Sequence, residues 1–277
     1  TTSLLLATIS AIIGSGWLFS CFIAAQMAGP SSLIAWIIGG LSVIVIAFVF
    51  AEICTLIPIT GSSSRSPLLS HGNTTSFIFS WMIWLSWMAM VPTEVQAVLQ
   101  YSTILYPDLT NAAGKLSNTG LGAATCLMLI LSVINIYSLK WLLKCNNILT
   151  ILKFFIPIII SIIILTNHHD MSTSLKYGFA PSNIHGILAA LSSGGIVFAF
   201  HGFKQAAEMA GEAKNPSKTI PIAIIGSIVA CLMLFLLLQL AFLTSITPEN
   251  IAHQWHNLGN ANTGIDSNSP LFSILRQ

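Results

Sequence analysis

Three small residues interrupt an apolar stretch near the start of the chain, in "AIIGSGWLFS", where Gly14, Ser15 and Gly16 lie at its centre. Glycine weakens a helix by about 1 kcal/mol relative to alanine, and a serine hydroxyl competes for backbone hydrogen bonds. A break frees N–H and C=O groups, which are tolerated at membrane depth only where protein or a water-filled cavity covers them. The triplet therefore predicts a cavity beside it, unless it only allows another helix to pack closely.

A second cluster of helix-breaking residues lies far along the chain, where Gly194 and Gly195 precede an aromatic patch at 198–200 and Gly202 follows it. The half-helix that starts after Gly14 would present N–H groups and a positive dipole end, which suit a carboxylate. The half-helix that ends near 198–200 would present C=O groups, which suit an ammonium. The two breaks together predict a site for a zwitterion.

Two ionisable residues lie inside apolar stretches, where such groups are costly and indicate function. Lys153 shares a helix face with Thr150 and Pro157, and we expect this face to point into the protein. It could carry protons, because a buried lysine releases its proton more readily; the alternative is a side chain that snorkels to the cytoplasmic surface. Glu94 could relay protons, meet a cationic substrate group, or serve as a protonated structural residue bonded to a carbonyl.

The composition indicates the elements that must position these groups. The chain has 277 residues, 55% of them hydrophobic and 6% charged, and a mean hydropathy of +0.84. Its apolar runs are continuous rather than alternating, so they predict membrane-spanning helices and not a barrel. Seven runs are long enough to cross about 30 Å of hydrocarbon. They cover roughly 4–27, 33–58, 77–105, 121–137, 148–166, 184–209 and 220–246.

The charges predict an orientation and exclude one class of partner. Lysine and arginine concentrate in alternate loops, which places the N-terminus in the cytoplasm of a plasma or inner membrane protein. The loops carrying them contain Arg65, Lys140, Lys144, Lys214 and Lys218. The net charge of +2 has no basic cluster behind it, so nucleic acid is not an expected partner. The cysteines have no metal-binding spacing, and we expect no cofactor.

Five motifs carry a resemblance to a known family. They are "IIGSGWLFS", "AEICTLIPITG", "WMIWLSW", "NNILTILKFFIP" and, most specifically, "FAFHGFKQAAEMAGEAKNPSKTIPIAI". In this order they resemble an amino acid permease of the amino acid–polyamine–organocation superfamily. The sequence departs from that family at Lys204, where a glutamate is common, and after Pro58, where a Gly-Gly-aromatic stretch is usual.

The resemblance implies an all-α membrane fold of two inverted five-helix repeats, with the first and sixth helices broken at mid-membrane. Residues 1–166 would form the first repeat, and 184–246 would form helices six and seven. Residues 247–277 would be an extracellular loop leading to an eighth helix that this sequence lacks. On this basis the chain resembles a fragment of a permease.

The resemblance also assigns residues to roles. The backbone around the first break would hold a substrate carboxylate, and that around the second break would hold its amine. Phe198, as an aromatic lid, and Gly202 would take part in gating. Lys153 matches a lysine on the fifth helix that replaces a sodium ion in proton-coupled relatives, which makes Lys153 and Glu94 the proton-coupling candidates. The substrate-binding residues would be Ile13, Gly14, Ser15, Gly16, Trp17, Phe198, Ala199 and Phe200.

We therefore expect a secondary transporter that moves an amino acid or related amine by alternating access, driven by protons or exchange. Its partners would be that substrate, the lipid bilayer and protons. An enzyme is not expected, because the sequence has neither a phosphate-cradling loop nor a His-Glu-x-x-His motif. One alternative is a truncated chain that does not transport. The other is a seven-helix receptor-like protein, against which the charge bias argues, as does a last span without the lysine that a retinal pigment needs.

Overall fold

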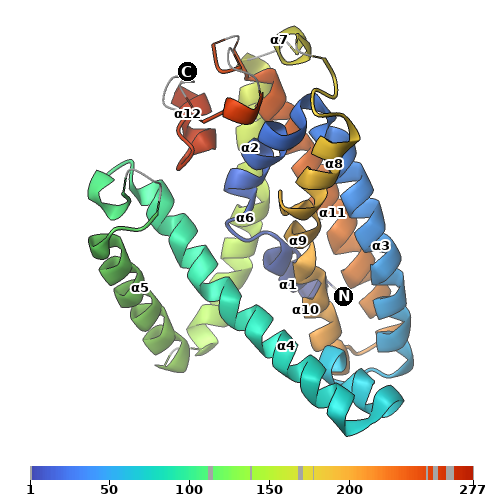
Figure 1. Ribbon diagram of the computed structural model, residues 1–277. Coiled ribbons are helices and arrows are strands. Elements are labelled where there is room, and N and C mark those ends of the chain that lie inside the picture. Colours follow the sequence, from blue (N-terminus) through green and yellow to red (C-terminus); the bar gives the residue numbers. More distant parts are fainter. Residues whose placement is uncertain are drawn as a thin grey trace.

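The computed structural model describes residues 2–111, 115–137, 139–167, 171–176, 178–247, 249–251, 255–259 and 265–276. Over these ranges the chain is helical, and its β-pairing is limited to an isolated bridge between Thr110 and Leu116 (Figure 1). The α-helices are α1 (Thr2–Ile12), α2 (Trp17–Ala28), α3 (Ser32–Leu56), α4 (Ser62–Ser102), α5 (Asn118–Tyr137), α6 (Leu139–Asn167), α7 (Ser172–Leu175), α8 (Asn183–Ser192), α9 (Ile196–Ala199), α10 (Lys204–Glu208), α11 (Pro216–Thr244) and α12 (Pro270–Arg276).

Six helical segments of the described residues are long and apolar enough to cross a membrane. The sequence predicts seven, and the difference lies at the N-terminus. The first expected span is divided between α1 and α2, and a 3-10 turn at Gly29–Ser31 joins α2 directly to α3. The segments are Trp17–Leu56, Ser62–Ser102, Asn118–Ile136, Ile148–Asn167, Asn183–Glu208 and Pro216–Thr244.

Helix α11 lies at the centre of the main bundle, where it packs against α1, α3 and α6. The core between these helices is close-packed and includes the fully buried side chains of Trp36, Phe235 and Leu238. The Trp36 indole N–H donates to Gln239 Oε1 at 3.0 Å, and Gln239 Nε2 donates to the Cys21 carbonyl at 3.2 Å. This buried chain of hydrogen bonds connects α2, α3 and α11.

Helices α4 and α5 stand apart from that bundle. Helix α4 crosses it obliquely, and α5 lies beside α4, with one end next to the start of α6 (Figure 1). The two share a small core of their own, formed by Val95, Leu99 and Ala124. The long α4 is bent at Gly72, whose φ of 82° is not helical. Residues before this bend, expected to be a loop, form a short helix.

Candidate functional site

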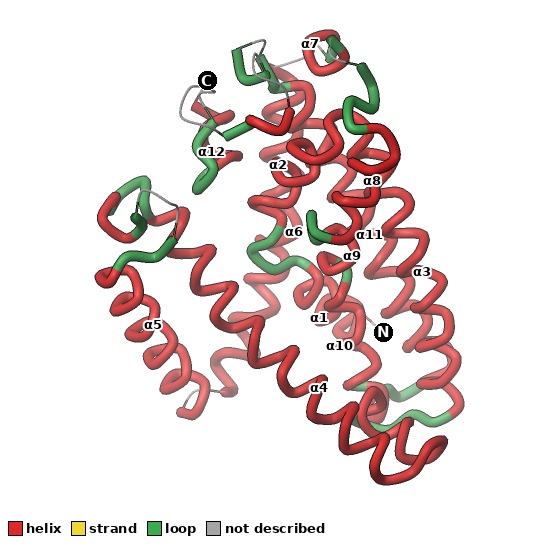
Figure 2. Tube along the Cα trace, viewed as in Figure 1, coloured by secondary structure: helices red, strands yellow, loops and turns green. Residues whose placement is uncertain are grey.

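The first helix is broken where the sequence predicts. Helix α1 ends at Ile12, the N–H of Gly14 turns back to the Ile12 carbonyl at 3.0 Å, and α2 begins at Trp17. The N–H groups of Gly16 and Trp17 have no hydrogen-bond acceptor among the described residues. Figure 2 shows this interruption as a loop part-way along the bundle. The break therefore exposes backbone donors at the N-terminal end of α2.

The half-helix before the aromatic patch ends earlier than the sequence predicts. Helix α8 ends at Ser192, and Gly195 adopts a left-handed φ of 77° that favours glycine. The short helix α9 follows, then a 3-10 turn at His201–Phe203 and α10. The aromatic patch at 198–200 thus belongs to a separate helical piece and not to the end of the preceding half-helix. The interruption itself is where Gly194 and Gly195 indicate.

The two breaks lie next to each other, because the 3-10 turn at His201–Phe203 packs against α1. A Cβ atom at Gly202 would collide with the backbone of Ala11 and Ile12, so glycine is required for this close approach. Both breaks line one cavity of about 490 Å³, whose other walls come from α2 and α4. This volume falls within the usual range of small-molecule sites.

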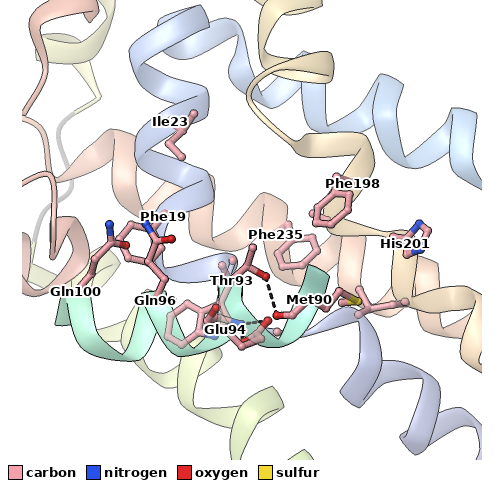
Figure 3. Close-up of a pocket in the computed structure, with 18 of the residues that line it drawn as sticks. Phe19, Ile23, Met90, Thr93, Glu94, Gln96, Gln100, Phe198, His201 and Phe235 are labelled. Carbon is pink, nitrogen blue, oxygen red and sulfur yellow. Dashed lines mark hydrogen bonds between the residues drawn. The ribbon is translucent and has the colours of Figure 1, made fainter. Parts of the chain in front are cut away.

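The structure brings most of the expected site residues to this cavity. Those that line it are Gly14, Ser15, Gly16, Trp17, Glu94, Phe198, Ala199 and Gly202. Phe198 is 62% exposed and stacks on His201 with ring centroids 5.7 Å apart (Figure 3). Two of the expected substrate-binding residues do not line the cavity. Ile13 is 1% exposed, and Phe200 is fully buried between Trp36 and Phe235 in the main core.

Lys153 does not line the cavity either. Its side chain is exposed on α6, although Thr150, Pro157 and Ser161 on the same helix are buried. The expectation that this face points into the protein therefore holds for Thr150 and Pro157 but not for the lysine. Within this chain Lys153 contacts no charged partner among the described residues. Its assignment to proton coupling stays a prediction.

Glu94 lies directly on the first break. The backbone N–H of Ser15 donates to both carboxylate oxygens, at 3.1 Å to Oε1 and 2.9 Å to Oε2. The side chain reaches this position from α4 and is half-buried (Figure 3). A Cβ atom at Gly14 would collide with Glu94 Oε1, so the glycine makes room for the carboxylate. A carboxylate of the protein itself thus occupies the donor that the sequence assigns to a substrate carboxylate.

Other polar residues of the cavity were not assigned from the sequence. Thr93, Gln96 and Gln100 line it from α4, spaced at intervals of three and four residues. That spacing, in the mainly apolar part of α4 after residue 77, is the signal that could have identified them. His201 lines the opposite side, with its Nε2 3.3 Å from Ser86 Oγ. The cavity therefore combines an exposed aromatic ring with hydrogen-bonding groups from two sides.

Known proteins are similar to this chain over nearly its whole length. A family profile described as amino acid permease matches residues 1–265. The chain is 36% identical over 265 residues to the glutamate/serine transporter AimA of Bacillus subtilis (strain 168), covering 93% of this chain and 49% of that protein. It is 34% identical over 257 residues to the aspartate-proton symporter of the same organism, covering 92% and 49%.

A more distant relative is the methylthioribose transporter of Bacillus subtilis (strain 168), 28% identical over 256 residues, with 88% of this chain and 54% of that protein covered. The chain spans about half the length of the curated relatives it matches. The family and the apolar helices agree on an integral membrane protein and confirm the resemblance seen in the motifs. The chain belongs to the amino acid permease family.

Proposed function

We propose that this chain is part of a secondary active transporter that carries an amino acid by alternating access. The observation that carries the proposal is the meeting of two interrupted helices at one cavity, in a member of the amino acid permease family. Interrupted helices of this kind form substrate sites in transporters, because their free backbone groups can bind charged ligands in a low-dielectric interior. The substrate carboxylate binds near Ser15, and its ammonium near the carbonyl groups of the second break.

The packing supports a division of the helices into two parts that can move relative to each other. Helices α1–α3, α6 and α8–α11 share the main core, whereas α4 and α5 have a separate small core. Because the cavity lies between the first group and α4, rocking one part against the other would open it to either side of the membrane. The N-terminus faces the cytoplasm in this proposal, as the loop charges predict.

Acidic amino acids and serine are the first substrates to test. Relatives in this family are a glutamate/serine transporter and an aspartate-proton symporter, and the second supports protons as the coupling ion. The cavity contributes side chains that can hydrogen-bond a second carboxylate or a hydroxyl, namely Thr93, Gln96, Gln100 and His201. These groups lie beside the break where the backbone would hold the α-carboxylate that all amino acids have.

Uptake by the complete gene product in proteoliposomes tests the proposal. Radiolabelled glutamate, aspartate and serine are each offered with and without an inward proton gradient, against protein-free liposomes. We expect uptake of at least one of them, and more of it with the gradient. Failure of a broad amino acid panel to bind or enter would refute the proposal. A gradient that has no effect would remove proton coupling and leave exchange.

Two further proteins extend the same experiment. The variant Lys153→Ala tests the second coupling candidate: we expect it to lose gradient-driven accumulation while exchange of internal for external substrate continues. The 277-residue chain by itself is expected not to catalyse uptake, because it spans about half the length of its relatives. Robust uptake from liposomes that hold only this chain would contradict that expectation and the fragment interpretation.

A further inference from the structure

We propose that Glu94 is an internal occupant of the substrate carboxylate site, and that an amino acid binds there only when Glu94 leaves and takes up a proton. The inference deepens the proposed function and rests on it. It identifies the group that makes binding depend on pH, and it explains why a glutamate faces the broken first helix. Glu94 is then a positioning and coupling residue rather than a simple structural one.

The contact geometry is that of a bound carboxylate. Both Glu94 oxygens lie on the single N–H of Ser15, at 2.9 and 3.1 Å, and the pair approaches from the cavity side. Gly14 leaves the space that Oε1 fills. A substrate carboxylate directed at the same N–H would have to occupy the same space. Because two anions cannot share one donor in a low-dielectric site, the two carboxylates exclude each other at the Ser15 N–H.

The surroundings of Glu94 contain little positive charge that could hold both anions at once. Residues Thr2–Ala28, which form α1, the break and α2, contain no acidic, basic or histidine side chain, and neither does α5. Of the described residues lining the cavity, the other titratable side chain is His201. Asp266 lies in the loop before α12. The other charged or titratable residues with described side chains, on elements packed against α4, α1 and α2, are Glu52, Asp108, Lys153, His185, Lys204, Glu208, Lys218, His256 and Arg276.

The exchange balances as one proton taken up for each substrate bound. The Ser15 N–H passes from a Glu94 oxygen to an oxygen of the substrate carboxylate, and no covalent bond of the protein changes. A proton from the surrounding solution binds the released Glu94 carboxylate, which is then neutral and tolerates its partly buried position. The substrate carboxylate replaces the lost negative charge beside the N-terminal end of α2, where the helix dipole favours it.

The experiment measures glutamate and serine affinity for the complete gene product in detergent across about pH 5 to 8, by equilibrium binding of labelled substrate. In the wild type we expect affinity to fall as the pH rises, by up to about tenfold per pH unit, because one proton is bound with the substrate. The variant Glu94→Gln, whose amide carries no charge to compete, should bind with little dependence on pH. A wild-type pH profile in Glu94→Gln would overturn the proposal.

Two matched variants assign the effect to Glu94. Glu52→Gln removes an identical charge from an exposed position on α3 and should keep the wild-type pH profile. His201→Asn removes the other titratable group of the cavity, and its affinity for serine, which has no second carboxylate, should still fall as the pH rises. Loss of the profile in His201→Asn, together with its retention in Glu94→Gln, would transfer the role to the histidine and refute the inference.

Proton uptake on binding provides a second test that does not depend on any variant folding. Substrate is added to wild-type protein in weakly buffered solution with a pH indicator, at the alkaline end of the range. We expect close to one proton taken up per substrate bound, and no uptake would overturn the proposal. Binding that is tight but independent of pH would refute this inference alone, whereas absence of amino acid binding at every pH would refute the proposed function.

Discussion

Replacement of Gly14 by alanine is the sharpest test of the carboxylate site at the first break. A Cβ atom at this position would collide with Glu94 Oε1, so the methyl group fills the space that a carboxylate needs in order to reach the Ser15 N–H. Gly16, in the same loop, has no atom within 4 Å of the corresponding position. The two substitutions make the same chemical change, but one of them blocks the site and the other points into open space.

The expected magnitudes follow from the contact that is lost. A hydrogen bond to a charged group contributes about 1.5–3 kcal/mol, so Gly14→Ala should weaken amino acid binding by about 10- to 150-fold. The same change expels the Glu94 carboxylate, but alanine also lowers the entropy of the unfolded chain by about 0.4–1 kcal/mol. The net loss in free energy of unfolding is then about 0.5–2.5 kcal/mol. Gly16→Ala should lose less affinity and little stability, because its φ of −56° suits alanine.

Equilibrium binding of labelled glutamate and serine, with denaturant unfolding followed by tryptophan fluorescence in detergent, measures both quantities. Gly122→Ala on α5 serves as a control outside the site, since it lies on a helix with open space around it. Equal losses of affinity in Gly14→Ala and Gly16→Ala would refute the reasoning, because the collision with Glu94 would not be the cause. Wild-type affinity in Gly14→Ala would remove the Ser15 N–H from the substrate site altogether.

Two further predictions concern the scaffold that holds the cavity in place. Gln239→Leu leaves the Trp36 indole N–H without its acceptor and should lower the free energy of unfolding by about 1–3 kcal/mol. The control Ser132→Ala, at an exposed position on α5, should change it by no more than about 0.5 kcal/mol. Equal denaturation midpoints for the two variants would contradict this prediction. Gly202→Ala pushes the 3-10 turn at His201–Phe203 away from Ala11 and should lower the free energy of unfolding by about 1–3 kcal/mol in the same assay. A wild-type unfolding curve for this variant would show that the close approach is not required.

The helix breaks could be predicted from the sequence because their causes are local. Glycine and serine weaken a helix wherever they occur in it, so Gly14-Ser15-Gly16 and Gly194-Gly195 mark interruptions without any knowledge of their neighbours. The sequence also predicts a membrane protein, because the composition and length of its apolar helices indicate that lipid rather than water surrounds them. The end of α8 at Ser192 was less predictable, because a left-handed Gly195 can stop a helix before the aromatic residues that follow.

The composition and the order of the residues by themselves determined that this is a helical membrane chain with two breaks that can expose backbone groups. Only the tertiary structure decided what faces those breaks. The contact between Glu94 and Ser15 joins residues 79 positions apart, and packing rather than periodicity turns Phe198 to the cavity, Phe200 to the core and Lys153 to the surface. The physical reason is that helix propensity acts within a few residues, whereas the partner of a freed N–H depends on how distant helices pack together.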